Sequence, residues 1–265
     1  MVLGVHKDMK HFDCFPFFNE LELLHLRLLE YYEFVDYFVL VEATKSHTGK
    51  NKPLYYKENK DRFEDFSDKI INVIVQDMPE YNQFNIWPSE NYQRNAIMNG
   101  LQGTAETGDK IYISDCDEFW DIDIAKNNID NNSWVTFRQE LFYYYVNCKQ
   151  NCTWDGSVVA PYGSFKDIQT LRDFARYGNG VQSGGWHFSF MGGAERIKEK
   201  VENIAESHLI IDKVGSVLEI QNKIDSVKDL WNRTDDYAKK SIVPITYKPK
   251  KLDEWLKIYP NFMRG

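Results

Sequence analysis

Residues 36–43, Asp36-Tyr-Phe-Val-Leu-Val-Glu-Ala43, form a nearly uninterrupted run of β-forming residues. An apolar run without alternating polar positions is typical of a strand buried on both faces of a parallel sheet. Residues 69–75 and Lys110-Ile-Tyr-Ile-Ser114 repeat this pattern downstream, and residues 11–17 form a shorter apolar run upstream. These four segments therefore predict strands of one mainly parallel central sheet.

Helical patterns separate these strands. Apolar residues recur at helical spacing within residues 20–32, at Leu21, Leu24, Leu28 and Tyr31. Residues 89–101 predict a second helix, with Ser89 as its N-cap. Alternating strands and helices indicate an α/β fold with right-handed crossovers and helices flanking the sheet. Ligands of such sheets bind beyond the carboxyl ends of the strands, so the residues that follow each strand are the first candidates for a site.

The second half of the chain is less regular. We predict β segments at residues 134–137, 140–146 and 181–190, and a helix at residues 194–205 after Gly192-Gly193. Two more helices are expected, at residues 217–231 and 252–258. The sequence contains no internal repeat and no Pro/Gly/Ser-rich linker. We therefore predict a single domain over residues 1–265, with residues 211–265 as a C-terminal helical extension.

The charge balance argues against a nucleic-acid partner. The chain has 32 Lys and Arg against 40 Asp and Glu, a net charge of −8, and no long basic block that would match a phosphate backbone. The apolar run at the start of the sequence is too short for a signal peptide, and charged residues follow it closely. No stretch of about 18 apolar residues suggests a membrane span. The sequence predicts a soluble, cytoplasmic protein.

The most informative segment is Ile111-Tyr-Ile-Ser-Asp-Cys-Asp-Glu118, in which a strand runs directly into Asp115 and Asp117. Two carboxylates this close repel each other and are costly to desolvate unless a cation lies between them. Carboxylate oxygens suit Mg²⁺ or Mn²⁺, which also bind the phosphates of a nucleoside diphosphate. Asp-x-Asp alone is a weak signal, but its place after a buried strand favours a metal site.

Other residues that follow strands or begin helices complete the predicted site. Asn19, Glu20 and Glu42 are candidates to bind a base or ribose, and Arg94 is a candidate to reach a diphosphate. The alternatives are that Glu20 complements a helix N-terminus and that Arg94 forms a surface salt bridge.

A glycine-rich segment supplies the remaining candidates. Glycines in Gly184-Gly-Trp-His187 would let the backbone approach a bound sugar, and Trp186 would stack on it. His187 and His208 are candidate metal or phosphate contacts, although a single histidine is more often structural. Glu195, at the start of the helix after Gly192-Gly193, is our predicted general base, with Glu118 and Glu206 as alternatives.

Five blocks in the same order resemble glycosyltransferase family 17, whose best-known members are β-1,4-mannosyl-glycoprotein 4-β-N-acetylglucosaminyltransferases. The blocks lie roughly within residues 11–210: Asp13-Cys-Phe-Pro-Phe-Phe-Asn-Glu-Leu-Glu-Leu-Leu24, Asp36-Tyr-Phe-Val-Leu-Val-Glu-Ala-Thr44 with Thr48-Gly-Lys50 and Lys52-Pro53, Glu90-Asn-Tyr-Gln-Arg94, Ile113-Ser-Asp-Cys-Asp-Glu118, and Gly184-Gly-Trp-His-Phe-Ser-Phe190.

This resemblance implies a GT-A-type nucleotide-sugar-binding fold, a UDP-sugar donor (typically UDP-GlcNAc), inversion at the anomeric carbon and a glycan or glycoconjugate acceptor. It supports Asp115 and Asp117 as the binding motif for Mn²⁺ (or Mg²⁺). It also implies substrate-binding positions at Asn19, Glu20, Glu42, Arg94, Glu118, Trp186 and His187. Because no membrane anchor or stem like that of the Golgi members is expected, a microbial or viral polysaccharide, lipid-linked glycan or protein acceptor stays open.

The predicted reaction is a single displacement. A cation held by Asp115 and Asp117, with His208 as a further ligand, would bind the diphosphate of UDP. Glu195 would deprotonate the acceptor hydroxyl. Two rival functions stay open: a carbohydrate-binding protein without turnover, and a nucleotidyltransferase, which would normally need a basic triphosphate loop that the sequence does not show.

Overall fold

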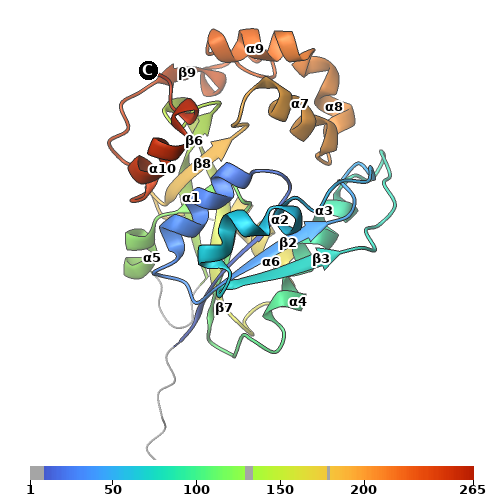
Figure 1. Cartoon of the computed structure of the whole chain (residues 1–265), viewed down its shortest axis with the longest axis vertical. Coiled ribbons are helices and arrows are strands. Elements are labelled where there is room, and N and C mark those ends of the chain that lie inside the picture. The colour runs from blue at the N-terminus through green and yellow to red at the C-terminus, as the bar shows by residue number, and fades with distance from the viewer. Residues whose placement is uncertain (1–8, 129–133, 178–179) are drawn as a thin grey trace, which may run out of the picture.

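The computed structural model describes residues 9–128, 134–177 and 180–265. Within these residues, nine strands form one sheet flanked by helices (Figure 1). The α/β class predicted from the sequence is therefore confirmed. The strand order is β3-β2-β1-β4-β7-β6-β8-β5, and β9 pairs with β7.

The first half of the chain forms the parallel part of the sheet. Neighbouring strands in the order β3-β2-β1-β4 all run in parallel, as predicted. These strands are β1 His11–Pro16, β2 Tyr37–Ala43, β3 Ile70–Val75 and β4 Lys110–Ile113. The helical elements between them are α1 Leu21–Tyr31, α2 Tyr55–Glu58, the 3-10 helix η1 Lys60–Phe66, α3 Trp87–Asn95 and α4 Ile97–Leu101.

Strand β2 is apolar over most of its length because it packs against two cores. Successive side chains of a strand point to opposite faces. In β2, Phe38 and Leu40 face the core shared with α1, whereas Val39 and Val41 face the core shared with α4 and with α6 (Ile168–Tyr177). Both faces of the strand are thus covered by helices, which explains the unbroken hydrophobic run that decided the fold prediction.

The predicted helix over residues 89–101 is divided into α3 and α4 at Ala96. Helix α3 begins at Trp87, two residues earlier than predicted, with Pro88 in its first turn. Proline suits this position because its fixed φ fits the helix and its missing N–H group has no intrahelical partner there. Ser89 therefore lies inside the helix and is not its N-cap.

The second half of the chain makes the sheet mixed. Strands β6 and β7 are antiparallel neighbours joined by the short segment between Tyr143 and Cys148, a connection that only antiparallel strands allow. Strand β8 is parallel to β6 and antiparallel to β5. The sheet is thus parallel over its first four strands and mixed beyond them. The elements are β5 Glu118–Trp120, α5 Ile122–Asn128, β6 Val135–Tyr143, β7 Cys148–Pro161 and β8 Gly185–Ser189.

The glycines before Trp186 serve the packing of strands. A Cβ atom on Gly185, whose φ is +134°, would lie 2.0 Å from the carbonyl oxygen of Phe119 in β5. A Cβ atom on Gly184 would lie 2.8 Å from the Arg138 nitrogen in β6. The predicted close approach of backbone is therefore present, but the approaching partner is a neighbouring strand and not a sugar.

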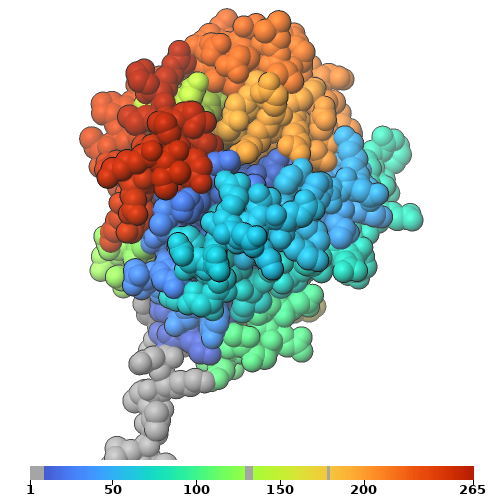
Figure 2. All heavy atoms as spheres, viewed as in Figure 1, coloured from blue at the N-terminus to red at the C-terminus, as the bar shows by residue number. Residues whose placement is uncertain are grey.

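A separate group of helices covers the carboxyl ends of the parallel strands. Its members are α7 Ala194–Asn203, α8 Ser207–Val214 and α9 Val217–Asp225. They pack on their own apolar cluster, which includes Ile197, Val201 and Ile220. In the space-filling view this orange segment lies directly against the blue N-terminal part of the chain (Figure 2).

Residues 211–265 are more than the helical extension predicted for them. Strand β9 (Lys240–Ile242) pairs with β7, and helix α10 (Leu252–Ile258) packs on α1 (Figure 1). Trp255 is fully buried in the main core, and its Nε1 donates to the Glu22 carbonyl oxygen at 2.7 Å. Two short 3-10 helices, η2 Asp236–Ala238 and η3 Pro260–Phe262, complete the segment.

Among the described residues, no helix has the length and apolar character needed to cross a membrane.

Candidate active site

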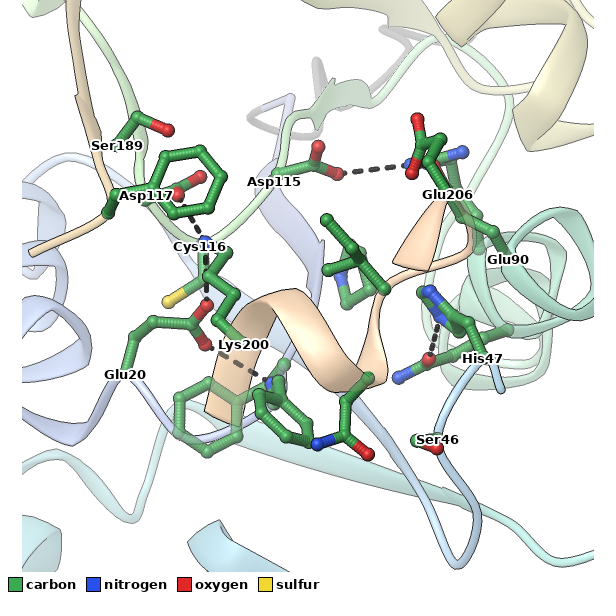
Figure 3. A pocket seen from close by; sticks show the side chains of 18 of the residues that line it. Glu20, Ser46, His47, Glu90, Asp115, Cys116, Asp117, Ser189, Lys200 and Glu206 are labelled. Carbon is green, nitrogen blue, oxygen red and sulfur yellow. Dashed lines mark hydrogen bonds and ion pairs between the residues drawn. The ribbon is translucent and has the colours of Figure 1, made fainter. Parts of the chain in front are cut away.

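A cavity of about 240 Å³ lies at the carboxyl ends of β1, β2 and β4, beneath α7 and α8 (Figure 3). This is the place where open α/β sheets bind their ligands. Five of the residues predicted for the site line it: Glu20, Arg94, Asp115, Asp117 and His187. They come from the connections after β1 and β4, from α3 and from β8. The tertiary fold thus brings together the post-strand positions that the sequence singled out.

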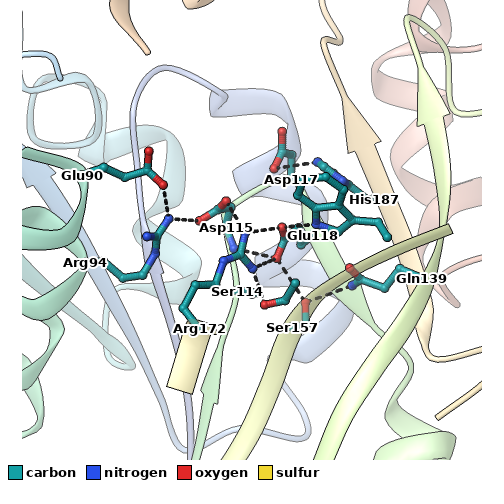
Figure 4. Close-up of polar contacts among 12 residues, drawn as sticks. Glu90, Arg94, Ser114, Asp115, Asp117, Glu118, Gln139, Ser157, Arg172 and His187 are labelled. Atoms are coloured by element: carbon teal, nitrogen blue, oxygen red, sulfur yellow. Dashed lines mark hydrogen bonds and ion pairs between the residues drawn. The ribbon is translucent and has the colours of Figure 1, made fainter. Parts of the chain in front are cut away.

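The acidic pair lies in the turn between β4 and β5, and each carboxylate has a cationic partner; Figure 4 shows those of Asp115. Asp115 Oδ2 lies 2.7 Å from Arg172 Nη2, and its Oδ1 lies 3.2 Å from Arg94 Nη2. Asp117 Oδ2 lies 2.7 Å from Lys200 Nζ, and its Oδ1 lies 3.4 Å from His187 Nε2.

These cations keep both carboxyl groups ionised. Burial raises the pKa of Asp115 and of Asp117, but the neighbouring groups together outweigh it, with Arg172 and Lys200, respectively, contributing most, and hold both pKa values well below their usual range. Two adjacent carboxylates need positive charge beside them. In this structure the side chains of Arg94, Arg172 and Lys200 supply it.

Glu118 anchors the acidic turn from below. Its fully buried carboxylate accepts hydrogen bonds from both Arg172 Nη atoms at 2.7 Å and from Trp154 Nε1 at 2.5 Å. It also accepts from the Asp115 backbone N–H at 3.1 Å. Burial opposes its ionisation, but Arg172 lowers its pKa. Glu118 does not line the cavity, so the structure gives it a positioning role in place of the predicted contact with substrate.

Arg94 is buried and donates hydrogen bonds to three neighbouring side chains. Its Nη2 donates to Glu90 Oε1 at 2.6 Å and to Asp115 Oδ1 at 3.2 Å, and its Nη1 donates to Gln169 Oε1 at 2.8 Å. Burial disfavours its charge, yet the two carboxylates raise its pKa. Arg94 is thus no surface salt bridge. It orients Asp115, and its Nε, which has no hydrogen-bond partner among the described residues, is buried.

Lys200 of α7 bridges the segment that follows β1 and the turn that follows β4. Its Nζ donates to Asp117 Oδ2 at 2.7 Å and to Glu20 Oε1 at 3.1 Å. The other Glu20 oxygen accepts from the backbone N–H groups of Phe18 and Asn19. Figure 3 shows the ammonium group between the two carboxylates. One helix therefore neutralises acids that lie almost a hundred residues apart in the sequence.

We tested whether these residues fit Mn²⁺ or Mg²⁺. Glu20 and Asp117 direct oxygen atoms at one position, now taken by the Lys200 ammonium group, and oxygen donors suit both cations. Across residues 9–128, 134–177 and 180–265, no group of three or more His, Cys, Asp or Glu side chains is arranged to hold a metal. Mg²⁺ is commonly bound by one or two carboxylates together with substrate phosphates. The residues therefore fit a metal that binds together with a diphosphate, with Lys200 moved aside.

Glu206, which follows α7, is the cavity acid without a partner. In the described part of the chain, no side chain and no backbone N–H group other than its own donates to its carboxylate. Burial raises its pKa, and the charges of Glu90 and Asp115 add to this effect, against the opposing effects of its own backbone N–H group and of the Arg176 charge. Figure 3 shows Glu206 beside Glu90. A partly desolvated carboxylate that faces a cavity has the properties of a general base.

Glu195, the predicted base, is exposed in the first turn of α7 and does not line the cavity. The α7 helix turns Lys200 toward the acidic pair, and Glu195 lies on a different side of the helix. Because a base must lie within hydrogen-bonding reach of the acceptor hydroxyl, this placement disfavours the predicted role.

Four other predicted residues lie outside the cavity. Asn19 donates to Glu199 Oε2 at 2.7 Å, and the buried Glu42 carboxylate accepts from the first backbone N–H groups of α2. Trp186 packs in the core against Tyr247, their ring centroids 4.5 Å apart. His208 is exposed, with Nδ1 3.2 Å from the Tyr81 hydroxyl. The structure therefore separates His208 from Asp115 and Asp117 and gives the other three structural contacts.

Several residues that shape the site were not found by sequence reasoning: Trp154, Arg172, Arg176 and Lys200. They lie in β7, α6 and α7, between 37 and 85 residues after Asp115 or Asp117. None belongs to a recognisable local motif, and their spacing carries no signal. Only the packing of α6 and α7 over the sheet edge brings them to the acidic pair.

Comparison with known families agrees with the geometry. A model of glycosyltransferase family 17 matches residues 4–244, which is most of the chain. No match was found among curated proteins. A match of this extent, together with an acidic pair at the carboxyl end of the sheet, identifies the chain as a member of glycosyltransferase family 17.

Proposed function

We propose that this glycosyltransferase moves a sugar, N-acetylglucosamine, from a UDP-sugar to a hydroxyl group of a glycan, with inversion at the anomeric carbon. The observation that carries the proposal is the charge pattern of the cavity. The acidic pair, with Glu20, Glu90 and Glu206, shares the cavity with five cationic residues of the described chain, Lys45, Lys52, Arg94, Arg176 and Lys200. Such a surface suits an anionic donor at the carboxyl ends of the strands. The uridine base and the sugar are inferred from the family.

Glu206 is assigned as the general base in this proposal, in place of Glu195. The acceptor oxygen attacks the anomeric carbon while its proton passes to the Glu206 carboxylate. The bond between that carbon and the phosphate oxygen breaks, and its electron pair leaves with UDP. Attack from the side opposite the leaving group inverts the anomeric centre.

Asp117 is the residue that we expect to contact Mn²⁺ or Mg²⁺, because Asp115 is held by Arg94 and Arg172. A bound divalent cation would neutralise charge on the departing diphosphate. His208 is not part of this assignment because it lies outside the cavity.

The donor is tested by thermal unfolding with UDP-GlcNAc, UDP-Glc, UDP-Gal and GDP-Man. A ligand that binds only the native state at a hundredfold excess over its Kd stabilises it by ~2.7 kcal/mol. That is a Tm increase of roughly 5–10 °C for a chain of this size. We expect the UDP-sugars to give this increase and GDP-Man to give none.

Product analysis completes the donor test. A transferase releases UDP in the presence of acceptor, a nucleotidyltransferase releases pyrophosphate, and a carbohydrate-binding protein releases neither. The absence of a Tm increase with every nucleotide sugar would overturn the proposed donor site.

Metal binding is expected to depend on the nucleotide. Mn²⁺ alone should leave the Tm unchanged, because Lys200 already neutralises Glu20 and Asp117. Mn²⁺ with UDP should raise the Tm above the value measured with UDP in EDTA. Asp117→Asn should remove the metal-dependent part of this increase, whereas Asp155→Asn, which alters a carboxylate paired with Arg138, should preserve it. Equal stabilisation by Mn²⁺ with and without UDP would contradict the assignment.

A further inference from the structure

The charged side chains of the cavity differ in whether the protein already satisfies them. Glu20, Glu90, Arg94, Asp115, Asp117 and Lys200 all form ion pairs with one another or with Arg172. Lys52 lies over the rings of Phe18 and Tyr55 and donates to the Pro53 carbonyl oxygen. The guanidinium of Arg176 has no ion pair and no hydrogen bond to any described residue. Its N–H groups are therefore available to a ligand.

Stacking holds Arg176 in place. Its guanidinium carbon lies 3.8 Å from the ring centroid of Trp154. Trp154 is itself fixed, because its Nε1 donates to Glu118 at 2.5 Å and its ring lies 4.8 Å from that of His187. A guanidinium that stacks on an aromatic face keeps its planar set of N–H donors directed outward. Arg176 is thus positioned without using its hydrogen-bonding capacity.

The position of Arg176 on α6 places it next to the acidic pair. Arg172, one turn earlier on the same helix, contacts Asp115 at 2.7 Å. Residues four apart lie on the same face of a helix, about 5–6 Å apart. Partial burial and the charge of Arg172 both lower the pKa of Arg176, so an anion beside it would relieve an unfavourable interaction.

We propose that Arg176 binds a phosphate oxygen of the donor diphosphate and stabilises the departing UDP. This inference rests on the proposed function. A diphosphate brought near Asp115 and Asp117 needs positive charge, and Arg94, Arg172 and Lys200 are already engaged by carboxylates, which leaves Arg176 and the cavity lysines Lys45 and Lys52. The guanidinium plane matches the geometry of phosphate oxygens, which a lysine ammonium group does not.

The test is calorimetric titration of the full chain with UDP and with uridine. Arg176→Gln should weaken UDP binding by about ten- to a hundredfold, the loss expected for one charge-assisted hydrogen bond. It should leave uridine binding unchanged, because uridine has no phosphate. Arg176→Lys should give an intermediate loss for UDP.

Arg62→Gln is the matched control, because Arg62 lies over an aromatic ring (Phe63, 5.9 Å) and forms no ion pair with another described residue, yet is exposed outside the cavity. It removes the same charge and should not alter UDP affinity. An Arg176→Gln variant that binds UDP within twofold of wild type, or that loses uridine and UDP equally, overturns the role of Arg176. A wild-type protein that binds no UDP overturns the proposed function itself.

Discussion

Replacing Glu206 with glutamine is expected to lower kcat for sugar transfer by about a hundred- to ten-thousandfold, the contribution typical of a general base. Glutamine keeps the size of the side chain but cannot accept the proton of the acceptor hydroxyl. UDP affinity should stay close to that of the wild type, because the carboxylate makes no hydrogen bond to another described residue. Initial rates of UDP release with saturating acceptor, and a separate UDP titration, measure the two quantities.

The pH profile provides a second readout for Glu206. A general base works only when ionised, so the rate should fall as the pH drops through its pKa. Because burial and neighbouring acids raise the pKa of Glu206, this fall should occur at a higher pH than the ordinary glutamate pKa of about 4.3 would give. The Glu206→Gln variant should lack this acidic limb.

Glu195→Gln is the control for the base assignment. Glu195 is exposed outside the cavity, so this variant should keep wild-type kcat and the same pH profile. The opposite pattern, a loss of activity in Glu195→Gln with Glu206→Gln unaffected, would restore Glu195 as the base and refute Glu206.

Replacing Arg27 with methionine is expected to destabilise the fold by about 3–5 kcal/mol, the cost of breaking a buried ion pair. Arg27 and Asp13 are both fully buried, and two hydrogen bonds of 2.6 Å join them. Its Nη1 also donates to backbone carbonyl oxygens in the acidic turn, at Asp115, Cys116 and Glu118. The substitution leaves the buried Asp13 carboxylate without an ion-pair partner, with the hydrogen bond from Trp120 Nε1 at 3.2 Å remaining, and it removes one donor from each of these carbonyl groups.

The expected loss corresponds to a Tm decrease of roughly 6–20 °C for a chain of this size. Folded Arg27→Met protein should also bind UDP more weakly, because the acidic turn loses its support. Arg138→Met is the control, since its partly exposed pair with Asp155 should contribute at most about 1 kcal/mol. Equal Tm decreases in the two variants would contradict the special role of Arg27. The double variant Asp13→Leu, Arg27→Met should recover part of the stability, because it removes the uncompensated charge.

Arg27 also illustrates what the sequence pattern did not reveal. It lies within α1, whose leucine spacing predicts a simple apolar face, yet its charged side chain is fully buried. Helical periodicity predicts which face is buried, but it does not show that a charged residue on that face has a partner on a strand. That information depends on the positions of β1 and β4 relative to α1.

The residues predicted for the site fall into two groups for the same reason. Asp115, Asp117 and Glu20 were found because they follow strands of a parallel sheet, whose carboxyl ends meet at one edge by necessity. Trp186 and His208 were misplaced because their positions depend on how β8 and α8 pack, and nothing local in the sequence fixes that packing. The proposed general base differs from the predicted one for a similar reason: Glu195 lies in the first turn of α7 and Glu206 follows the helix, and only the docking of that helix decides which one reaches the cavity.

The sequence by itself determined the α/β class, the parallel direction of the first four strands and the acidic pair at their edge. It does so because hydrophobic periodicity and residues that directly follow a strand are local properties of the chain. The tertiary structure alone decided which cations neutralise that pair and which groups are left free for a ligand. Arg172, Arg176 and Lys200 reach the site from helices that follow it in the chain, and electrostatic pairing depends on distance in space. The spacing of residues in the sequence does not reveal that distance.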